Sequence, residues 1–263
     1  MRAVARVLLL LCAGCTAVEL PAQGVLRREV DRVLNTYWRG REGYAISAKE
    51  ERRINRGDGN PGLYGELAPE GARRLAEEWG LCEGGKAVAT FADLGSGVGK
   101  LVVQSYLEWP GVHRALGVEL SATRAKRALE AWEALLLSDE AFELRQMALN
   151  LAGDNDATPN PAEEVKLLHG DLLDADLSDV THAYVSSLCF PESLIFDVSL
   201  KLKQAPRLRA VASLQPLNLD SGAGKGQERD EKESKKERKK DIKEKKRQKR
   251  KRTRKKERKE RTQ

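Results

Sequence analysis

The residues best suited to chemistry lie in one short stretch, Phe91 to Lys100, which reads FADLGSGVGK. Its three glycines, Gly95, Gly97 and Gly99, lie between an apolar run and a helix-prone one. Glycine permits positive φ and lets a ligand approach the backbone where a Cβ would be in the way. The pattern therefore predicts a strand, a ligand-binding turn and a helix. A tight turn without a ligand explains any one of these glycines, but it explains the three together less well.

The charges near the glycines indicate the kind of ligand. The spacing G-x-G-x-G differs from the G-x-G-x-x-G of dinucleotide-binding loops. Asp93 comes at the end of the predicted strand, where its carboxylate would repel a pyrophosphate and attract an ammonium or sulfonium group. Glu119 ends a second predicted strand, ALGVEL, and is suited to accept hydrogen bonds from both ribose hydroxyls. A strand-end Glu alone would be an ordinary exposed residue, but together the two carboxylates favour S-adenosylmethionine.

The elements that position these residues alternate between strand and helix patterns. Strands are expected at residues 87–94, 115–120, 165–171, 181–191 (running into a loop) and 208–217, and helices at 24–39, 47–56, 68–80, 98–109, 121–138, 139–151 and 191–204. Residues 153–164 have loop composition, and Leu129 is expected on the buried side of its helix. Such alternation predicts an α/β fold, with a Rossmann-like, doubly wound, mostly parallel sheet of about five strands.

Four chemically suited positions fall at the carboxyl ends of predicted strands, where doubly wound sheets bind ligands. They are Gly95, Glu119, Asp171 and Ser186. In a ligand-binding interpretation, Asp171 accepts a hydrogen bond from the adenine amino group and Leu172 packs on the ring. Without this context, an Asp that stabilises a turn explains Asp171 equally well. The coincidence of four positions supports a site more strongly than any one motif does.

Charge is divided unevenly along the chain. Residues 225–263 contain 22 Lys and Arg against 9 Asp and Glu, whereas the rest of the chain has 25 against 31. An acidic body is thus followed by a basic tail with almost no apolar residue, which predicts disorder or a single solvated helix. Such a tail is suited to neutralise DNA or RNA phosphates, and it also resembles a nuclear localisation run. A purely solubilising tail is the alternative.

The N-terminus and the cysteines bear on compartment and metal binding. Residues 1–17 have the basic start and short apolar centre of a secretory signal, too short to span a membrane comfortably. An apolar helix and a start codon placed too early remain alternatives. Four scattered cysteines predict no disulfide framework. Neither the cysteines nor the histidines have metal-ligand spacing, so no metal site is expected, and His113, His169 and His182 are expected on the surface or in loops.

From Tyr64 to Asn218 the sequence resembles the Dot1-like histone lysine methyltransferases. DLGSGVGK is similar to the family's DLGSGVGQ, with YGE before it and GVE and GD-hydrophobic-Leu after it. Lys100 stands where the family has Gln. The resemblance implies a class I methyltransferase fold, in which S-adenosyl-L-methionine would be held by Tyr64, Glu66, Asp93, Gly95, Gly97, Gly99, Lys100, Glu119, Asp171 and Leu172.

The resemblance also implies direct methyl transfer to a lysine of histone H3. Ser186, Ser187 and Phe190 occupy the segment that reads VNNFAF in the family, and they are the candidate catalytic residues, with Ser186 in the channel wall. No residue is an obvious general base. After Pro216 to Asn218 the sequence turns into SGAGKG and the basic tail, where the family continues with further strands. The sheet is therefore expected to be short by its last two strands.

The predicted organisation is a signal-like or apolar segment (1–23), a helical segment (24–62), a methyltransferase domain (63–219) and a Lys/Arg-rich tail (220–263). The expected protein is a nuclear monomer without a stable membrane span. It would act on histone H3 in nucleosomes and bind nucleic acid through residues 225–263. Two alternatives remain: a methyltransferase of another protein or small substrate in an organelle or secretory compartment, and a catalytically inactive chromatin or RNA binder.

Overall fold

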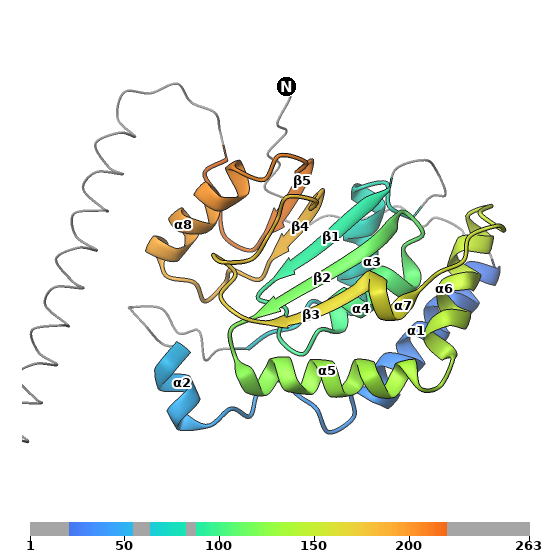
Figure 1. The fold of residues 1–263 in the computed structure, drawn as a ribbon, viewed down its shortest axis with the longest axis horizontal. Helices are drawn as coiled ribbons and strands as arrows, with labels where there is room; N and C mark the ends of the chain where they lie inside the picture. The colour runs from blue at the N-terminus through green and yellow to red at the C-terminus, as the bar shows by residue number, and fades with distance from the viewer. Residues whose placement is uncertain (1–20, 55–63, 83–87, 220–263) are drawn as a thin grey trace, which may run out of the picture. The chain divides into compact units, whose positions relative to one another are not determined.

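The computed structural model describes residues 21–54, 64–82 and 88–219 (Figure 1). Chain contacts divide the protein into two units, Met1–Leu219 and Asp220–Gln263, and all described residues belong to the first. The signal-like segment and the basic tail therefore lie almost entirely outside the described residues, and the domain boundaries stay predictions. None of the described helices has the length and apolar character needed to cross a membrane.

Five parallel strands form the sheet of the described residues, in the order β3-β2-β1-β4-β5. The strands are β1 (Ala89–Leu94), β2 (Val112–Glu119), β3 (Val165–His169), β4 (His182–Val185) and β5 (Ala210–Ser213). The strand order reverses at β1, which pairs with β2 on one side and with β4 on the other. The predicted Rossmann-like, doubly wound sheet is thus confirmed. Its switch point lies at the carboxyl end of β1, where Asp93 and the glycine loop are.

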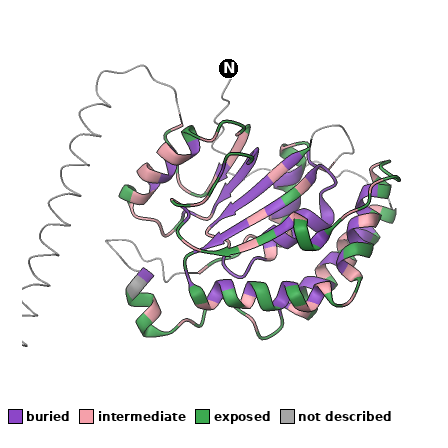
Figure 2. Ribbon diagram, in the orientation of Figure 1, coloured by how far each residue is buried: buried purple, intermediate pink, exposed green. Residues whose placement is uncertain are grey.

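Helices cover both faces of this sheet. They are α1 (Pro21–Tyr37), α2 (Ala48–Ile54), α3 (Pro69–Glu78), α4 (Lys100–Glu108), α5 (Ala122–Leu136), α6 (Glu140–Leu151), α7 (Pro161–Glu164) and α8 (Glu192–Lys203). Successive residues of a strand face opposite sides, so Phe91 packs in the core formed with α1, α3, α4, α5 and α6, and Ala92 packs in the core formed with α8. The central strand is therefore buried on both faces (Figure 2).

Three expectations about single positions or segments were wrong. The 153–164 stretch contains the short helix α7, which begins at Pro161 because proline fits the first helical turn. Leu129 is 43% exposed, since it lies about 100° around α5 from the buried Ala128. His182 is buried in β4, with Nδ1 2.9 Å from Thr181 Oγ1, and is not a surface or loop residue.

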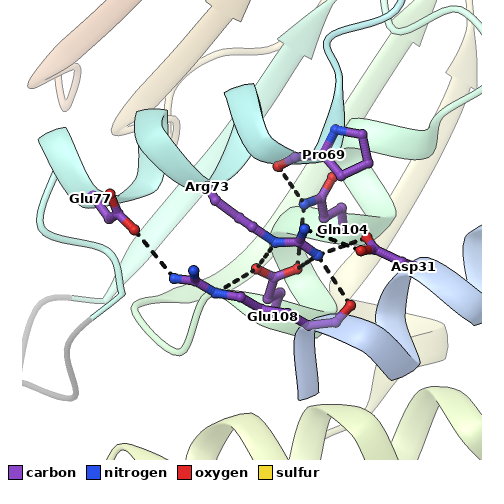
Figure 3. Close-up of polar contacts among 7 residues, drawn as sticks. Asp31, Pro69, Arg73, Glu77, Gln104 and Glu108 are labelled. Atoms are coloured by element: carbon purple, nitrogen blue, oxygen red, sulfur yellow. Dashed lines mark hydrogen bonds and ion pairs between the residues drawn. The ribbon is translucent and has the colours of Figure 1, made fainter. Parts of the chain in front are cut away.

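A buried network of charges joins α1, α3 and α4 (Figure 3). Arg73 donates from Nε and Nη2 to the two carboxylate oxygens of Glu108, at 2.7 and 3.0 Å, and from Nη2 to Asp31 Oδ1 at 2.7 Å. Gln104 adds a hydrogen bond to the carbonyl of Pro69. Burial raises the pKa of Glu108, and the Arg73 guanidinium opposes that shift. Because α4 begins directly after the glycine loop, this network helps to fix the loop.

A second buried cation also holds the C-terminal end of α4. Arg145 is 1% exposed and donates from Nη1 to the carbonyls of Tyr106 and Trp109, at 2.8 and 2.9 Å, and from Nη2 to that of Val112 at 2.6 Å. These include carbonyls left without helical partners where α4 ends. Arg145 therefore fixes the connection from α4 to β2.

Candidate cofactor and acceptor site

The glycine loop bends sharply at the end of β1. Gly95, Gly97 and Gly99 have φ of 93°, 56° and 80°, values that L side chains rarely adopt. The amide of Gly95 donates to the carbonyl of Val118 at 2.9 Å, which holds the turn over the end of β2. Backbone conformation therefore explains the choice of glycine at all three positions.

The surroundings of the three glycines differ. A Cβ on Gly99 would lie 3.0 Å from Leu167 and 3.2 Å from Ala128, so this glycine permits close packing of α4 against its neighbours. A Cβ on Gly95 would have its nearest neighbours at 3.5 Å, in the Phe190 ring, and 3.9 Å, in Ser186. The structure thus places Gly95 opposite the predicted acceptor loop, and Gly99 in the core beside the site.

Asp93 is the most unusual group at this edge of the sheet. Asp93 is 4% exposed, and its Oδ1 has no hydrogen-bond partner among the described residues. Burial, with a further contribution from the Glu119 carboxylate, raises the pKa of Asp93 to about 8. A buried carboxylate without a partner costs free energy unless a cation compensates it. Asp93 therefore fits a ligand with an ammonium or sulfonium group.

Glu119 is held beside Asp93 by two backbone amides. Its Oε2 accepts from Gly97 N at 2.8 Å and its Oε1 from Ser121 N at 2.7 Å. Burial raises the pKa of Glu119, and these donors together with Arg124 oppose the shift. Each carboxylate oxygen has capacity for a second hydrogen bond. The geometry suits two neighbouring hydroxyls, as the sequence predicts for a ribose.

The YGE segment closes over the glycine loop. A Cβ on Gly97 would lie 2.5 Å from the ring of Tyr64, so only glycine permits this approach. The Tyr64 hydroxyl donates to Glu66 Oε1 at 2.6 Å, and Lys100 Nζ lies 2.8 Å from Glu66 Oε2. Burial and the Glu66 carboxylate raise the pKa of Tyr64. The structure therefore brings together four residues that the resemblance assigns to cofactor binding.

The sequence did not predict the residues that surround the YGE segment and the neighbouring start of α5. The Arg124 guanidinium lies 4.7 Å from the centre of the Tyr64 ring and donates to the carbonyl of Gly43 at 2.9 Å. Glu50 accepts from the Ser121 hydroxyl at 2.7 Å, at the N-terminus of α5. The N-terminus of a helix favours a nearby acidic side chain, and Glu50 fills that role for α5. The sequence does not reveal this contact, because Glu50 and Ser121 are 71 positions apart.

Asp171 and Leu172 follow β3 and lie next to Glu119, whose carbonyl accepts from the amide of Gly170 at 2.9 Å. Asp171 is exposed and accepts from the amide of Leu173 through Oδ1 at 2.9 Å, so it stabilises a turn. Within the part of the chain that the structure describes, its second oxygen accepts no hydrogen bond. Leu172 is 9% exposed and packs in the core on the α8 side of the sheet. Contacts of both residues with an adenine stay predictions.

The predicted catalytic residues separate into two groups. Ser186 and Phe190 are half-buried and lie opposite Gly95. Ser187 is fully buried, its hydroxyl lies 2.6 Å from Ser213 Oγ, and it accepts from Gln215 N at 2.9 Å. These bonds hold the Ser187 side chain between the ends of β4 and β5. Catalytic roles for Ser186, Ser187 and Phe190 stay predictions.

No cluster of three or more His, Cys, Asp or Glu suited to a metal occurs among the described residues.

Comparisons with known proteins bear on the fold and the family. A comparison with curated protein sequences found no match. Among solved structures, the chain is similar to an RNA methyltransferase from Salinibacter ruber in complex with S-adenosyl-L-homocysteine, at 20% identity over 57% of this chain and 76% of that one, with a TM-score of 0.35. It is also similar to a SAM-dependent methyltransferase from Thiobacillus denitrificans, in complex with the same molecule, at 21% identity over 54% and 44%, with a TM-score of 0.28. Scores this low do not bear on function.

The family comparison is more specific. Residues 47–170 match the family described as "Histone methylation protein DOT1". This range includes the YGE segment, the glycine loop and Glu119, whose geometry is described above. Over this range the chain is similar to the DOT1 histone methylation family, in agreement with the resemblance seen in the sequence.

Proposed function

We propose that this chain is a protein lysine methyltransferase that acts on histone H3 in nucleosomes. The observation that carries the proposal is Asp93, a buried carboxylate with an unpartnered oxygen at the switch point of the sheet. It lies beside a second carboxylate, Glu119, that backbone amides hold in place. This pair suits a cofactor with a cationic group and a ribose.

When bound, S-adenosyl-L-methionine would supply a sulfonium-bound methyl group to an acceptor amine, with a thioether as the leaving group. The chain's own residues bind and orient. Asp93 would compensate the cofactor's positive charge, and Glu119 would accept hydrogen bonds from the ribose hydroxyls. Tyr64, held by Glu66 and Arg124, would exclude water from the glycine loop. Holding reactants in the right geometry accounts for much of the rate in such transfers.

The acceptor amine must be neutral to attack. From an ordinary lysine pKa of 10.4, deprotonation at pH 7 costs about 5 kcal/mol. A channel that removes water from the ammonium lowers this pKa, and the half-buried Ser186 and Phe190 are the candidates for its wall. The nitrogen's proton leaves to solvent, since no described residue is an obvious general base.

The choice of acceptor rests on the family and on charge. The matched family is one of histone methylation, and the 22 basic residues of 225–263 suit contact with nucleosomal DNA. A nuclear location follows from this choice of substrate.

The test is transfer of tritium from labelled S-adenosyl-L-methionine to nucleosomes, with free histone H3 and RNA as parallel acceptors. We expect label on a lysine of nucleosomal H3. Asp93→Asn should weaken cofactor binding at least tenfold by calorimetry, whereas Asp179→Asn, a change at an exposed ion pair, should leave it unchanged. Cofactor binding without transfer to any acceptor would indicate an inactive binder, and label on RNA would replace the proposed substrate.

A further inference from the structure

The loop after β4 is held by one side chain from the end of β5. Gln215 donates from Nε2 to three backbone carbonyls of this loop, those of Ser187 at 2.6 Å, Leu188 at 3.0 Å and Phe190 at 3.2 Å. Its own amide donates to Ser187 Oγ at 2.9 Å. One residue therefore contacts nearly the whole loop, although it is 25 to 28 positions away in the chain.

The loop has other contacts as well: Phe190 packs against the core on the α8 side of the sheet, and the amide of Ser186 donates to the carbonyl of Leu94 at 3.4 Å. Leu188 is 69% exposed, so it buries little apolar surface. Phe190 N donates to the carbonyl of Ser187 at 2.9 Å, which closes a turn within the loop but does not attach it to the sheet. The side chain of Gln215 and the contact between Ser187 and Ser213 attach residues 187–190 to the end of β5.

The loop also carries the residues that lie over the glycine loop. The ring of Phe190 and Cβ of Ser186 are the nearest atoms to a Cβ placed on Gly95, at 3.5 and 3.9 Å. We infer that Gln215 is a positioning residue for methyl transfer, which fixes Ser186 and Phe190 at the acceptor side of the site. The expected effect on methyl transfer rests on the proposed function. The expected effect on the order of the loop does not.

Gln215→Met removes the donors and keeps the length of the side chain. Misplacement of the loop should lower kcat about tenfold to a hundredfold, because alignment of the acceptor is lost. The cofactor Kd should change less than about threefold, since Asp93 and Glu119 lie at the ends of other strands. Gln215→Lys should keep kcat within about threefold of wild type, because an ammonium has three donors for the three carbonyls.

A second measurement does not need activity. Cys189, which is half-buried and forms no disulfide, lies in the loop. Its rate of alkylation by iodoacetamide, followed by peptide mass spectrometry, should rise several-fold in Gln215→Met and stay near wild type in Gln215→Lys. Cys82, which precedes β1 in the chain, is the internal reference. Gln146→Met is the matched control, because it removes a half-buried Gln donor, which binds Asn150 Oδ1 within α6, and should change the alkylation rate of neither cysteine.

The outcomes separate the two proposals. Wild-type kcat and a wild-type rate at Cys189 in Gln215→Met would overturn the positioning role, as would an equal effect of Gln215→Lys. A faster reaction at Cys189 in a protein that methylates nothing would support the role of Gln215 in ordering the loop and contradict the proposed function. If Gln215→Met lowers kcat and Gln146→Met does not, the effect belongs to the loop.

Discussion

At the scale of single residues, Asp93 both weakens the fold and equips the site. An ionised carboxylate without a partner is costly inside a protein, and burial raises the pKa of Asp93 to about 8. Between the ordinary pKa of 3.8 and about 8, the folded protein holds this proton more tightly than the unfolded chain does. The Asp93 contribution to stability is thus fully present below pH 4 and is lost as the pH rises toward 8.

We expect Asp93→Asn to flatten this pH dependence. The free energy of unfolding of the wild type should fall between pH 5 and pH 8, by at most about 1.4 kcal/mol per pH unit from this group, while the variant should show a smaller slope. Urea unfolding at pH 5, 6.5 and 8 measures both. At pH 8 without cofactor, the variant should be the more stable protein. Equal slopes in the two proteins would contradict the assigned cost of Asp93.

At the scale of elements, two buried cations anchor α4, the helix that follows the glycine loop. Arg73 and Glu108 fix α4 to α3 and α1, and Arg145 fixes its C-terminal end. The Glu108 side chain is only 4% exposed, so loss of Arg73 would leave this buried charge with one more distant cation, Arg27, at 3.7 Å. Breaking such a pair is costly, whereas replacing both partners by apolar groups costs much less.

Arg73→Met should therefore destabilise the protein by about 3–5 kcal/mol, and Arg73→Met combined with Glu108→Leu should recover much of that loss. Denaturant titration of the single and double variants gives the coupling. Arg207→Met breaks the exposed pair with Asp179, whose side chains are 65% and 59% exposed, and should cost about 1 kcal/mol or less. A double variant no more stable than Arg73→Met would show that the network matters for reasons other than the buried charge.

At the scale of the whole molecule, charge is divided between two parts of the chain. Residues 225–263 carry a large basic excess, and the rest of the protein is acidic. Phosphate neutralisation releases counterions, so its contribution to affinity falls steeply with salt. Cofactor binding at Asp93 and Glu119 involves no such release of DNA counterions.

Removal of residues 225–263 should weaken nucleosome binding and reduce its dependence on salt, while the Kd for S-adenosyl-L-methionine stays within about twofold. Fluorescence anisotropy with labelled nucleosomes between about 50 and 200 mM salt measures the first effect, and calorimetry the second. Nucleosome affinity and salt slope equal to those of the full chain would place the contact elsewhere.

The sequence by itself determined the parts of this protein that depend on local pattern. Alternating apolar runs predict the parallel sheet, because strands buried on both faces need them. The glycine spacing predicts the turn after β1, and Asp93 and Glu119 predict a cationic, ribose-containing ligand at its edge. These residues carry their chemistry in type and spacing, and the family match includes them.

Only the tertiary structure decided the contacts between segments far apart in the chain. The Tyr64 ring packs against Gly97, and the Arg124 guanidinium lies over the Tyr64 ring. The spacing of residues in the sequence predicts neither contact. The sequence suggests the same role for Ser187 as for its neighbour Ser186, but in the fold Ser187 is buried and contacts Ser213 and Gln215. Gln215 itself has no local signal, since its three acceptors are backbone carbonyls of another loop. A hydrogen bond to a backbone carbonyl depends on which segments of the chain lie side by side in the fold. Every residue has such a carbonyl, so the residue types do not reveal which one is the acceptor.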